Sequence, residues 1–306
     1  MDESRTAVLA ALLGNGMLAA LKGASAVATG SAAMLAETLH SVADTGNQAL
    51  LALGMRLSRR VPDRAHPFGH GKNVYFWAFV VAMMLFTLGG AFSIWEAVQK
   101  IRHGGEHVPS VWAYAVLAAG FVFEGVALGV AVRGVRRLKG RRRFLTFWRE
   151  TRDPTLLTVV LEDSAALVSL TVAAAGLALS QWTGQVRWDA AASGVIGVLL
   201  LGVAIALAIE NHSLLIGEAA PSHVEARIRR ALESDEMIAA VPTLKTMHVG
   251  PHALLVFAGV LLRDDCGVAD GIARARRRVE SALGADIQQR FIAIEPLTAE
   301  SARLAA

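Results

Sequence analysis

Hydrophobic residues gather into six long stretches within about the first 216 residues, with short polar segments between them. The stretches are rich in Ala, Leu, Val and Gly and contain few charges. Each approaches the ~20 apolar residues that a helix needs to cross a bilayer, and small residues let such helices pack closely. The pattern predicts six membrane-spanning helices, over Val8–Ala28, Met34–Leu57, Val74–Ile101, Val111–Val132, Leu156–Leu179 and Ala190–Leu215.

The pattern changes after about Gly217, where short apolar runs alternate with charged, amphipathic ones. Their order, α-β-β-α-β, predicts a small two-layer α+β domain over residues 217–306, following a membrane domain over residues 1–216. The apolar faces of such a domain also suit a homodimer. The predicted elements are a helix at His223–Leu232, strands at Leu244–Val249 and Ala253–Leu262, a helix at Ala269–Leu283 and a strand at Phe291–Ile294.

The composition agrees with an integral membrane protein, because 54% of the 306 residues are hydrophobic. The single cysteine, Cys266, excludes an intramolecular disulfide framework and a multi-cysteine zinc cluster. The net charge of +4 does not indicate nucleic-acid binding, because the arginines lie beside apolar stretches. No cleavable signal peptide is expected, since Asp2 and Glu3 occupy the N-terminus.

Basic residues are concentrated in two of the predicted loops. By the positive-inside rule these loops, and both termini, face the cytoplasm of a plasma or bacterial inner membrane. The opposite loops hold little positive charge. The basic residues are Arg56, Arg59, Arg60, Arg64 and Lys72 in one loop, and Arg133, Arg136, Arg137, Lys139, Arg141, Arg142, Arg143, Arg149 and Arg152 in the other.

Two pairs of ionisable residues interrupt the apolar stretches. His40 and Asp44 are four residues apart, so a helix places them on one face. They indicate either an ion or proton pathway or a polar tie between helices. Glu162 and Asp163 are adjacent in the fifth stretch and point about 100° apart.

A further carboxylate, Glu124, lies near the middle of the fourth stretch. It is a candidate metal ligand, proton carrier or neutral hydrogen-bonding group. One imidazole with two or three carboxylates suits zinc and equally manganese, iron(II), cobalt or nickel. Copper(I) is not expected, because the set contains no thiolate.

A second candidate site lies in the loop after the second stretch. Asp63, His66 and His70 fall within eight residues, and the glycines around them permit a tight turn. Three such side chains can wrap a borderline cation, although a solvated helix-entry loop has the same pattern.

Together these motifs resemble the cation diffusion facilitator family of proton-coupled metal exporters, over nearly the whole chain. The resemblance rests on Asn15 and Lys22, on the stretch from Ser31 to Asp44 with its His-Ser-x-x-Asp, and on the run His66-Pro67-Phe68-Gly69-His70-Gly71-Lys72. It implies a homodimeric antiporter of zinc-transporter type that exchanges a cytoplasmic divalent cation for protons. It also implies a metallochaperone-like cytoplasmic domain.

The resemblance implies a transport site made from the second and fifth helices. His40 and Asp44 match the first pair of ligands, and Glu162 matches one position of the second pair. The position four residues later is Ala166, so one usual ligand is missing, and Asp163 or Glu124 is expected to replace it. Asp63, His66 and His70 match an interfacial metal triad.

The domain after Gly217 departs from the family in a different way. It lacks the histidine-rich binuclear site of its relatives, with Glu295 as the surviving carboxylate and His248 and His252 isolated. Weak metal binding or none is therefore expected there.

Other classes of protein fit less well. An intramembrane metallohydrolase would need a water-activating motif such as His-Glu-x-x-His, which the sequence lacks. A regulatory or scaffold protein that has lost transport, and an ion channel without proton coupling, remain as alternatives.

Overall fold

The computed structural model describes residues 2–104, 111–139, 154–263, 267–284 and 287–298. The chain divides into two compact units. The first comprises Met1–Gly54 and Phe76–His212, and the second Met55–Tyr75 and Ser213–Ala306. The segment between the second and third predicted spans thus groups with the C-terminal residues. Cys266 and the basic residues Arg141, Arg142, Arg143, Arg149 and Arg152 lie outside the described residues.

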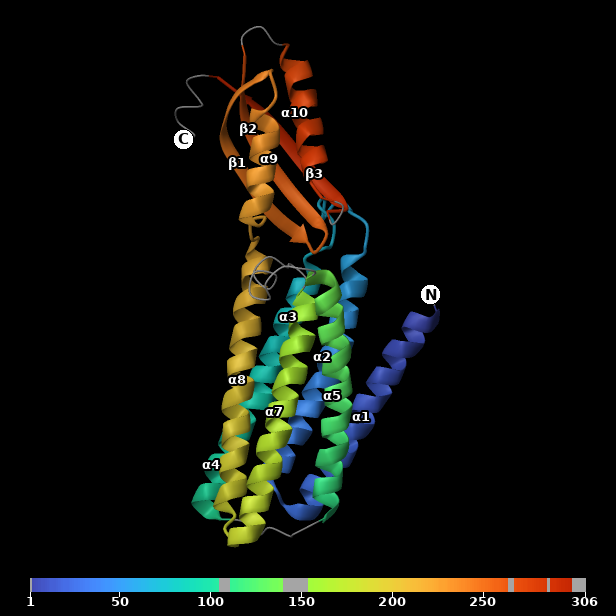
Figure 1. Cartoon of the computed structure of the whole chain (residues 1–306), viewed down its shortest axis with the longest axis vertical. Coiled ribbons are helices and arrows are strands. Elements are labelled where there is room, and N and C mark those ends of the chain that lie inside the picture. The colour runs from blue at the N-terminus through green and yellow to red at the C-terminus, as the bar shows by residue number, and fades with distance from the viewer. Residues whose placement is uncertain (1, 105–110, 140–153, 264–266, 285–286, 299–306) are drawn as a thin grey trace. The chain divides into compact units, whose positions relative to one another are not determined.

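The first unit is a bundle of long helices (Figure 1). Every predicted apolar stretch coincides with a helix, and the third stretch is one rod in which a π-helical segment joins two α-helices. The elements are α1 (Asp2–Thr29), α2 (Ala32–Ser58), α3 (Asn73–Met84), η1 (Leu85–Ala91), α4 (Phe92–His103), α5 (Val111–Lys139), α7 (Pro154–Thr183) and α8 (Arg187–Ile216).

Four of these rods are long and apolar enough to cross a membrane. They are Asn73–His103, Val111–Arg136, Val159–Thr183 and Arg187–Ile216. Helices α1 and α2 occupy the first two predicted spans but do not reach this threshold over the described residues, so six spans stay a prediction. The polar residues of α2 reduce its apolar character.

The outward face of α5 is apolar and its inward face carries a buried carboxylate. Val122, Val126 and Val130 are more than 60% exposed, whereas Glu124 on the opposite face is only 7% exposed. A helix with an apolar exterior and a buried carboxylate has its polar group directed into the bundle, as a membrane environment requires.

Close packing of α8 against the rod formed by η1 and α4 depends on glycine. A Cβ atom at Gly90 would lie 2.6 Å from Leu201 Cγ, and one at Gly197 would lie 2.7 Å from Ile94 Cγ1. Neither distance is compatible with a real side chain, so these glycines let the two backbones approach.

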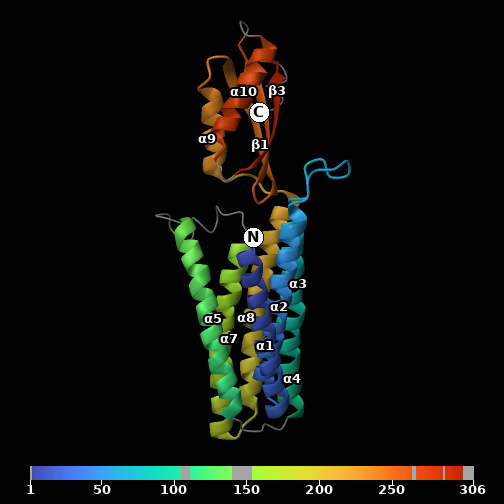
Figure 2. The same ribbon diagram turned by 90° about the vertical axis from the view of Figure 1, so that its right-hand side faces the viewer.

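The C-terminal part of the second unit has the predicted element order. Helices α9 (Ser222–Glu233) and α10 (Val268–Ala282) lie on one side of a three-stranded sheet (Figure 2). Strand β2 (Ala253–Leu262) is central, antiparallel to β1 (Ile238–Gly250) and parallel to β3 (Gln289–Leu297). Alternate residues of β2 form the buried core with the helices, namely Leu254, Val256, Ala258 and Val260.

Strand β1 is longer than predicted, since it begins at Ile238 and not at Leu244. Pro242 interrupts the strand pattern in the sequence because proline cannot donate a ladder hydrogen bond. The structure accommodates it with a register irregularity between Ala240 and Thr243.

Asp235, just after the end of α9, binds two arginines of α10. Its buried carboxylate accepts 2.8 Å hydrogen bonds from the Nε atoms of Arg274 and Arg278, and a 3.2 Å bond from the Met237 amide. Burial alone would raise the pKa of Asp235, but these hydrogen bonds outweigh it and hold the pKa below its ordinary value of 3.8.

We expect Asp235→Asn to lower the opening free energy of α10 by about 2 kcal/mol, because hydrogen bonds to a charged group contribute about that much. Hydrogen exchange of α10 amides in the full-length protein would measure it. A lowered native pKa stabilises the fold above the unfolded-state pKa, and this contribution is lost as pH falls through the native pKa. The difference between the two proteins should therefore shrink below about pH 4.

The matched control is Glu280→Gln, which removes the exposed 3.3 Å pair with Arg276 on the same helix. Its effect should stay below about 0.5 kcal/mol, since exposed ion pairs contribute little. Equal effects of the two substitutions would contradict the role given to Asp235.

Candidate metal sites

A polar stripe runs along the buried face of α2. Glu37, His40, Asp44 and Asn47 recur at intervals of three and four residues and are all at most 9% exposed. His40 Nε2 lies 3.6 Å from Asp44 Oδ2. Helical periodicity thus brings the predicted pair to one point inside the bundle.

Helix α7 supplies the second half of this cluster. Glu162 is buried and accepts a 2.7 Å hydrogen bond from Asn47 Nδ2, which ties α7 to α2. Asp163 is half-buried and interacts electrostatically with Glu124 and Asp44. Both neighbouring carboxylates are therefore electrostatically coupled to Asp44, whereas Ala166 is buried and contributes no ligand atom.

Glu124 of α5 completes the cluster. Its carboxylate interacts electrostatically with Asp44 and with His40. Helices α2, α5 and α7 therefore direct one imidazole and four carboxylates into the bundle. We call His40, Asp44, Glu124, Glu162 and Asp163 the intramembrane cluster.

Several polar atoms of the intramembrane cluster have no hydrogen-bond partner within the described part of the chain. They are both ring nitrogens of His40, Asp44 Oδ1 and Asp163 Oδ2. Buried polar atoms are normally satisfied, and unsatisfied ones carry a desolvation cost. Nitrogen and oxygen atoms left open in this way have the donor chemistry of a borderline divalent cation site.

Sequence reasoning missed two members of the α2 stripe. Glu37 precedes His40 by three residues and Asn47 follows Asp44 by three, so both share the predicted face. This three-residue spacing in the sequence was the signal that could have identified Glu37 and Asn47. Their partners, Lys22 and Glu162, are 15 and 115 residues away and could not be inferred from local spacing.

The loop triad is the tighter of the two sites. Among the described residues, Asp63, His66 and His70 form the group of three whose ligand atoms all lie within 4.8 Å of one another. Asp63 Oδ2 lies 3.0 Å from His70 Nε2, and Asp63 Oδ1 lies 3.4 Å from His66 Nδ1. The atoms of the intramembrane cluster are spread more widely than this.

Local backbone geometry shapes the loop triad. The His66 amide donates a 2.7 Å hydrogen bond to Asp63, and Gly69 adopts a φ of +82° that few other residues tolerate. Phe68 packs edge-on against Phe291, with ring centroids 5.3 Å apart. The backbone hydrogen bond from His66, with side-chain bonds from His70 and His66, lowers the pKa of Asp63 to about 2.

We expect His66→Ala to lower the affinity of the loop triad for zinc at least about 100-fold, because the loss of mere outer-shell partners costs 10- to 100-fold. Isothermal titration of the full-length protein should show one fewer zinc site per chain. Asp63 itself should remain an ionised ligand down to about pH 2.

Arg64→Ala is the matched control, because Arg64 lies exposed in the same loop and offers no ligand atom. It should leave the zinc stoichiometry unchanged. An unaltered stoichiometry in the His66 variant would show that the triad does not bind zinc.

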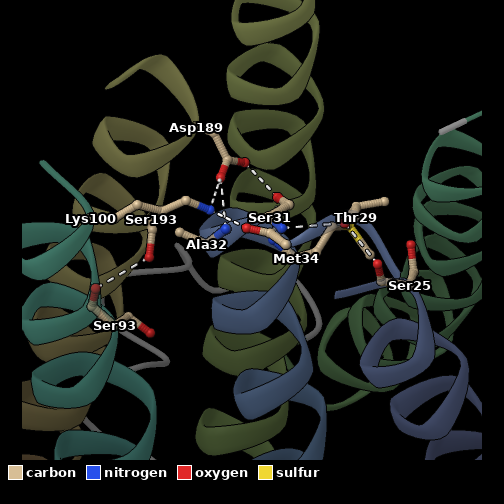
Figure 3. A network of polar contacts seen from close by, with 10 residues as sticks. Ser25, Thr29, Ser31, Ala32, Met34, Ser93, Lys100, Asp189 and Ser193 are labelled. Carbon is tan, nitrogen blue, oxygen red and sulfur yellow. Dashed lines mark hydrogen bonds and ion pairs between the residues drawn. The ribbon is translucent and has the colours of Figure 1, made fainter. Parts of the chain in front are cut away.

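A third polar network, at the N-terminal end of α8, is centred on the carboxylate of Asp189 (Figure 3). Asp189 accepts hydrogen bonds from Ser31 Oγ at 2.5 Å and from the Ala32 amide at 2.6 Å, and pairs with Lys100 Nζ at 3.2 Å. Lys100 also donates to the Gly30 carbonyl. This network caps the start of α2 and the end of α1, which indicates a structural role.

These features define a class of protein: a helical membrane protein that holds an open, cation-compatible cluster inside its bundle. Residues 8–216 match the family model for the cation efflux transmembrane domain, so the chain belongs to the cation efflux family. This confirms the resemblance to cation diffusion facilitators. The family and its characterised relatives are transporters and not enzymes.

Several curated relatives are identical to the chain at about a third of the positions in the matched region. The mitochondrial proton-coupled zinc antiporter SLC30A9 is 35% identical in Xenopus laevis and 33% in Homo sapiens, over 79% of this chain in each case. Metal tolerance protein C4 of Arabidopsis thaliana is 34% identical over 82% of this chain. The matched regions span 44%, 43% and 55% of those proteins, so the chain covers about half of their length.

Proposed function

We propose that the protein moves a divalent metal cation, first of all zinc, out of the cytoplasm in exchange for protons. The observation that carries this proposal is the intramembrane cluster with its open nitrogen and oxygen atoms. Membership of the cation efflux family and the names of the zinc antiporters similar to the chain support it.

The proposed ligands of the transported ion are His40, Asp44 and Glu162, with Asp163 next. Glu124 serves as a reserve ligand or as a proton carrier. Metal ligands must be deprotonated, so metal binding and proton binding at these side chains exclude each other. Facing the cytoplasm, the deprotonated cluster loads the metal. Facing the opposite side, protons compete for His40 and the carboxylates and expel it.

Asn47 has a positioning role in this scheme. Its amide holds Glu162 Oε1 at 2.7 Å, which fixes α7 beside α2 while leaving the open atoms of His40 and Asp44 to the ion. Asp63, His66 and His70 form a second metal site in the loop. Six spans, cytoplasmic termini, a transport domain over residues 1–216 and a dimerising domain over residues 217–306 complete the proposal.

The test is metal-driven proton flux in proteoliposomes that contain the purified full-length protein and a trapped pH dye. A zinc gradient should drive counterflow of protons, and a panel of manganese, iron(II), cobalt and nickel should rank the substrates. Metal movement without proton movement would indicate a channel. Metal binding without flux would indicate a regulatory homologue, which the missing ligand at Ala166 would explain.

A further inference from the structure

A lysine lies fully buried beside the intramembrane cluster. Lys22 of α1 forms a 2.9 Å ion pair with Glu37 Oε2 and donates a 2.7 Å hydrogen bond to Ser41 Oγ. Lys22 and Glu37 are 0% exposed. A buried ion pair is poor evidence for stability, because two apolar side chains of similar volume often stabilise a protein more.

The ion pair is part of the same α2 stripe as the proposed ligands. Glu37 precedes His40 by about one helical turn and interacts electrostatically with that imidazole. The Lys22 ammonium also interacts electrostatically with Asp44 and Glu124. Glu37 therefore adds a fifth carboxylate beside the cluster, and Lys22 adds a positive charge.

One oxygen of Glu37 is not engaged by the lysine. Glu37 Oε1 is buried and has no hydrogen-bond partner among the residues that the structure describes. The same is true of His40 Nδ1 and Asp44 Oδ1 farther along the stripe. Glu37 is thus a carboxylate with ligand capacity whose negative charge is cancelled by its neighbour.

We propose that Lys22 is a built-in counter-cation that keeps Glu37 from binding the transported metal, so that the metal is held weakly enough to be released. The inference rests on the proposed function. A fixed positive charge weakens the binding of any cation nearby, and the local low dielectric strengthens this effect. Without it, Glu37 would join the ligands and slow the release of the ion.

The first variant is Lys22→Met, which keeps the length of the side chain and removes its charge. Zinc binding by the full-length protein should tighten on the order of tenfold, the usual effect of one nearby charge. In proteoliposomes the KM for zinc and the turnover should both fall, because release becomes slower. Damage to the fold would instead weaken binding.

Two further variants complete a double-mutant cycle. Glu37→Gln leaves the ammonium unpaired beside the cluster and should weaken zinc binding about tenfold. Lys22→Met combined with Glu37→Gln removes both charges and should return the affinity to within about threefold of the unmodified protein. This comparison remains decisive if Lys22→Met alone does not fold.

Lys100→Met is the matched control, because it removes another buried lysine from the Asp189 network. It should lower stability and leave zinc affinity unchanged. Weakened or unchanged zinc binding in folded Lys22→Met protein, or equal affinities of Glu37→Gln and the double variant, would overturn the inference. Absence of metal transport by the unmodified protein would overturn the proposed function itself, before any variant is compared.

Discussion

Replacing Asp44 with alanine should lower metal-driven proton flux at least about 100-fold while leaving the helical bundle folded. Asp44 is a proposed ligand, and the loss even of outer-shell partners costs metal sites 10- to 100-fold. The assay is zinc-dependent acidification or alkalinisation in proteoliposomes, with initial rates compared at matched protein content. Undiminished flux in this variant would remove Asp44 from the transport site.

Although Asp44→Ala should lower the flux, it should not lower the stability of the protein. Asp44 Oδ1 has no hydrogen-bond partner within the described residues, and Oδ2 meets only the His40 ring, at 3.6 Å. Removing a poorly satisfied buried carboxylate relieves its desolvation cost. The unfolding temperature should therefore stay unchanged or rise.

Thr45→Ala is the matched control for the flux experiment. Thr45 is the next residue on α2, is half-buried, and donates a 2.8 Å hydrogen bond back to the Ser41 carbonyl of its own helix. This variant should keep normal flux and normal stability. A comparable loss of flux in both variants would indicate a general disturbance of α2.

Asp189→Ala should destabilise the protein by about 3 kcal/mol or more, the usual cost of removing one partner from a buried charged network. The substitution leaves the Lys100 ammonium without its counter-charge and takes the acceptor from Ser31 and the Ala32 amide. Unfolding of the detergent-solubilised, full-length protein by heat or denaturant would measure the effect.

The appropriate control is Asp270→Ala, which removes an exposed carboxylate from the first turn of α10. Its cost should not exceed about 1 kcal/mol, the upper range for an exposed helix-terminal charge. If Asp189→Ala were as stable as the unmodified protein, the Asp189 network would not have the structural role given to it.

The contrast between Asp44 and Asp189 separates functional from structural charge in this bundle. Both carboxylates are buried at the level of a hydrophobic core. Asp44 has an oxygen without a partner among the described residues, whereas both oxygens of Asp189 accept hydrogen bonds, from Ser31 Oγ and the Ala32 amide (Figure 3). Burial alone therefore did not distinguish them, and hydrogen-bond satisfaction did.

Local patterns in the sequence were sufficient for much of the fold. The apolar stretches, the order of elements after Gly217 and the loop triad all depend on residues close in the chain. Asp63, His66 and His70 are at most seven residues apart, so a tight turn that closes at Gly69 brings them together. The α2 stripe follows from helical periodicity in the same way.

Contacts between helices required the tertiary structure. Helical spacing alone did not show which of Glu162 and Asp163 faces α2, because the rotation of α7 decides which carboxylate meets Asn47. Lys22 with Glu37, and Asp189 with Ser31, join residues 15 and 158 positions apart. Periodicity specifies which face of a helix is polar, whereas side-chain packing between helices, as at Gly90 and Gly197, specifies what that face meets.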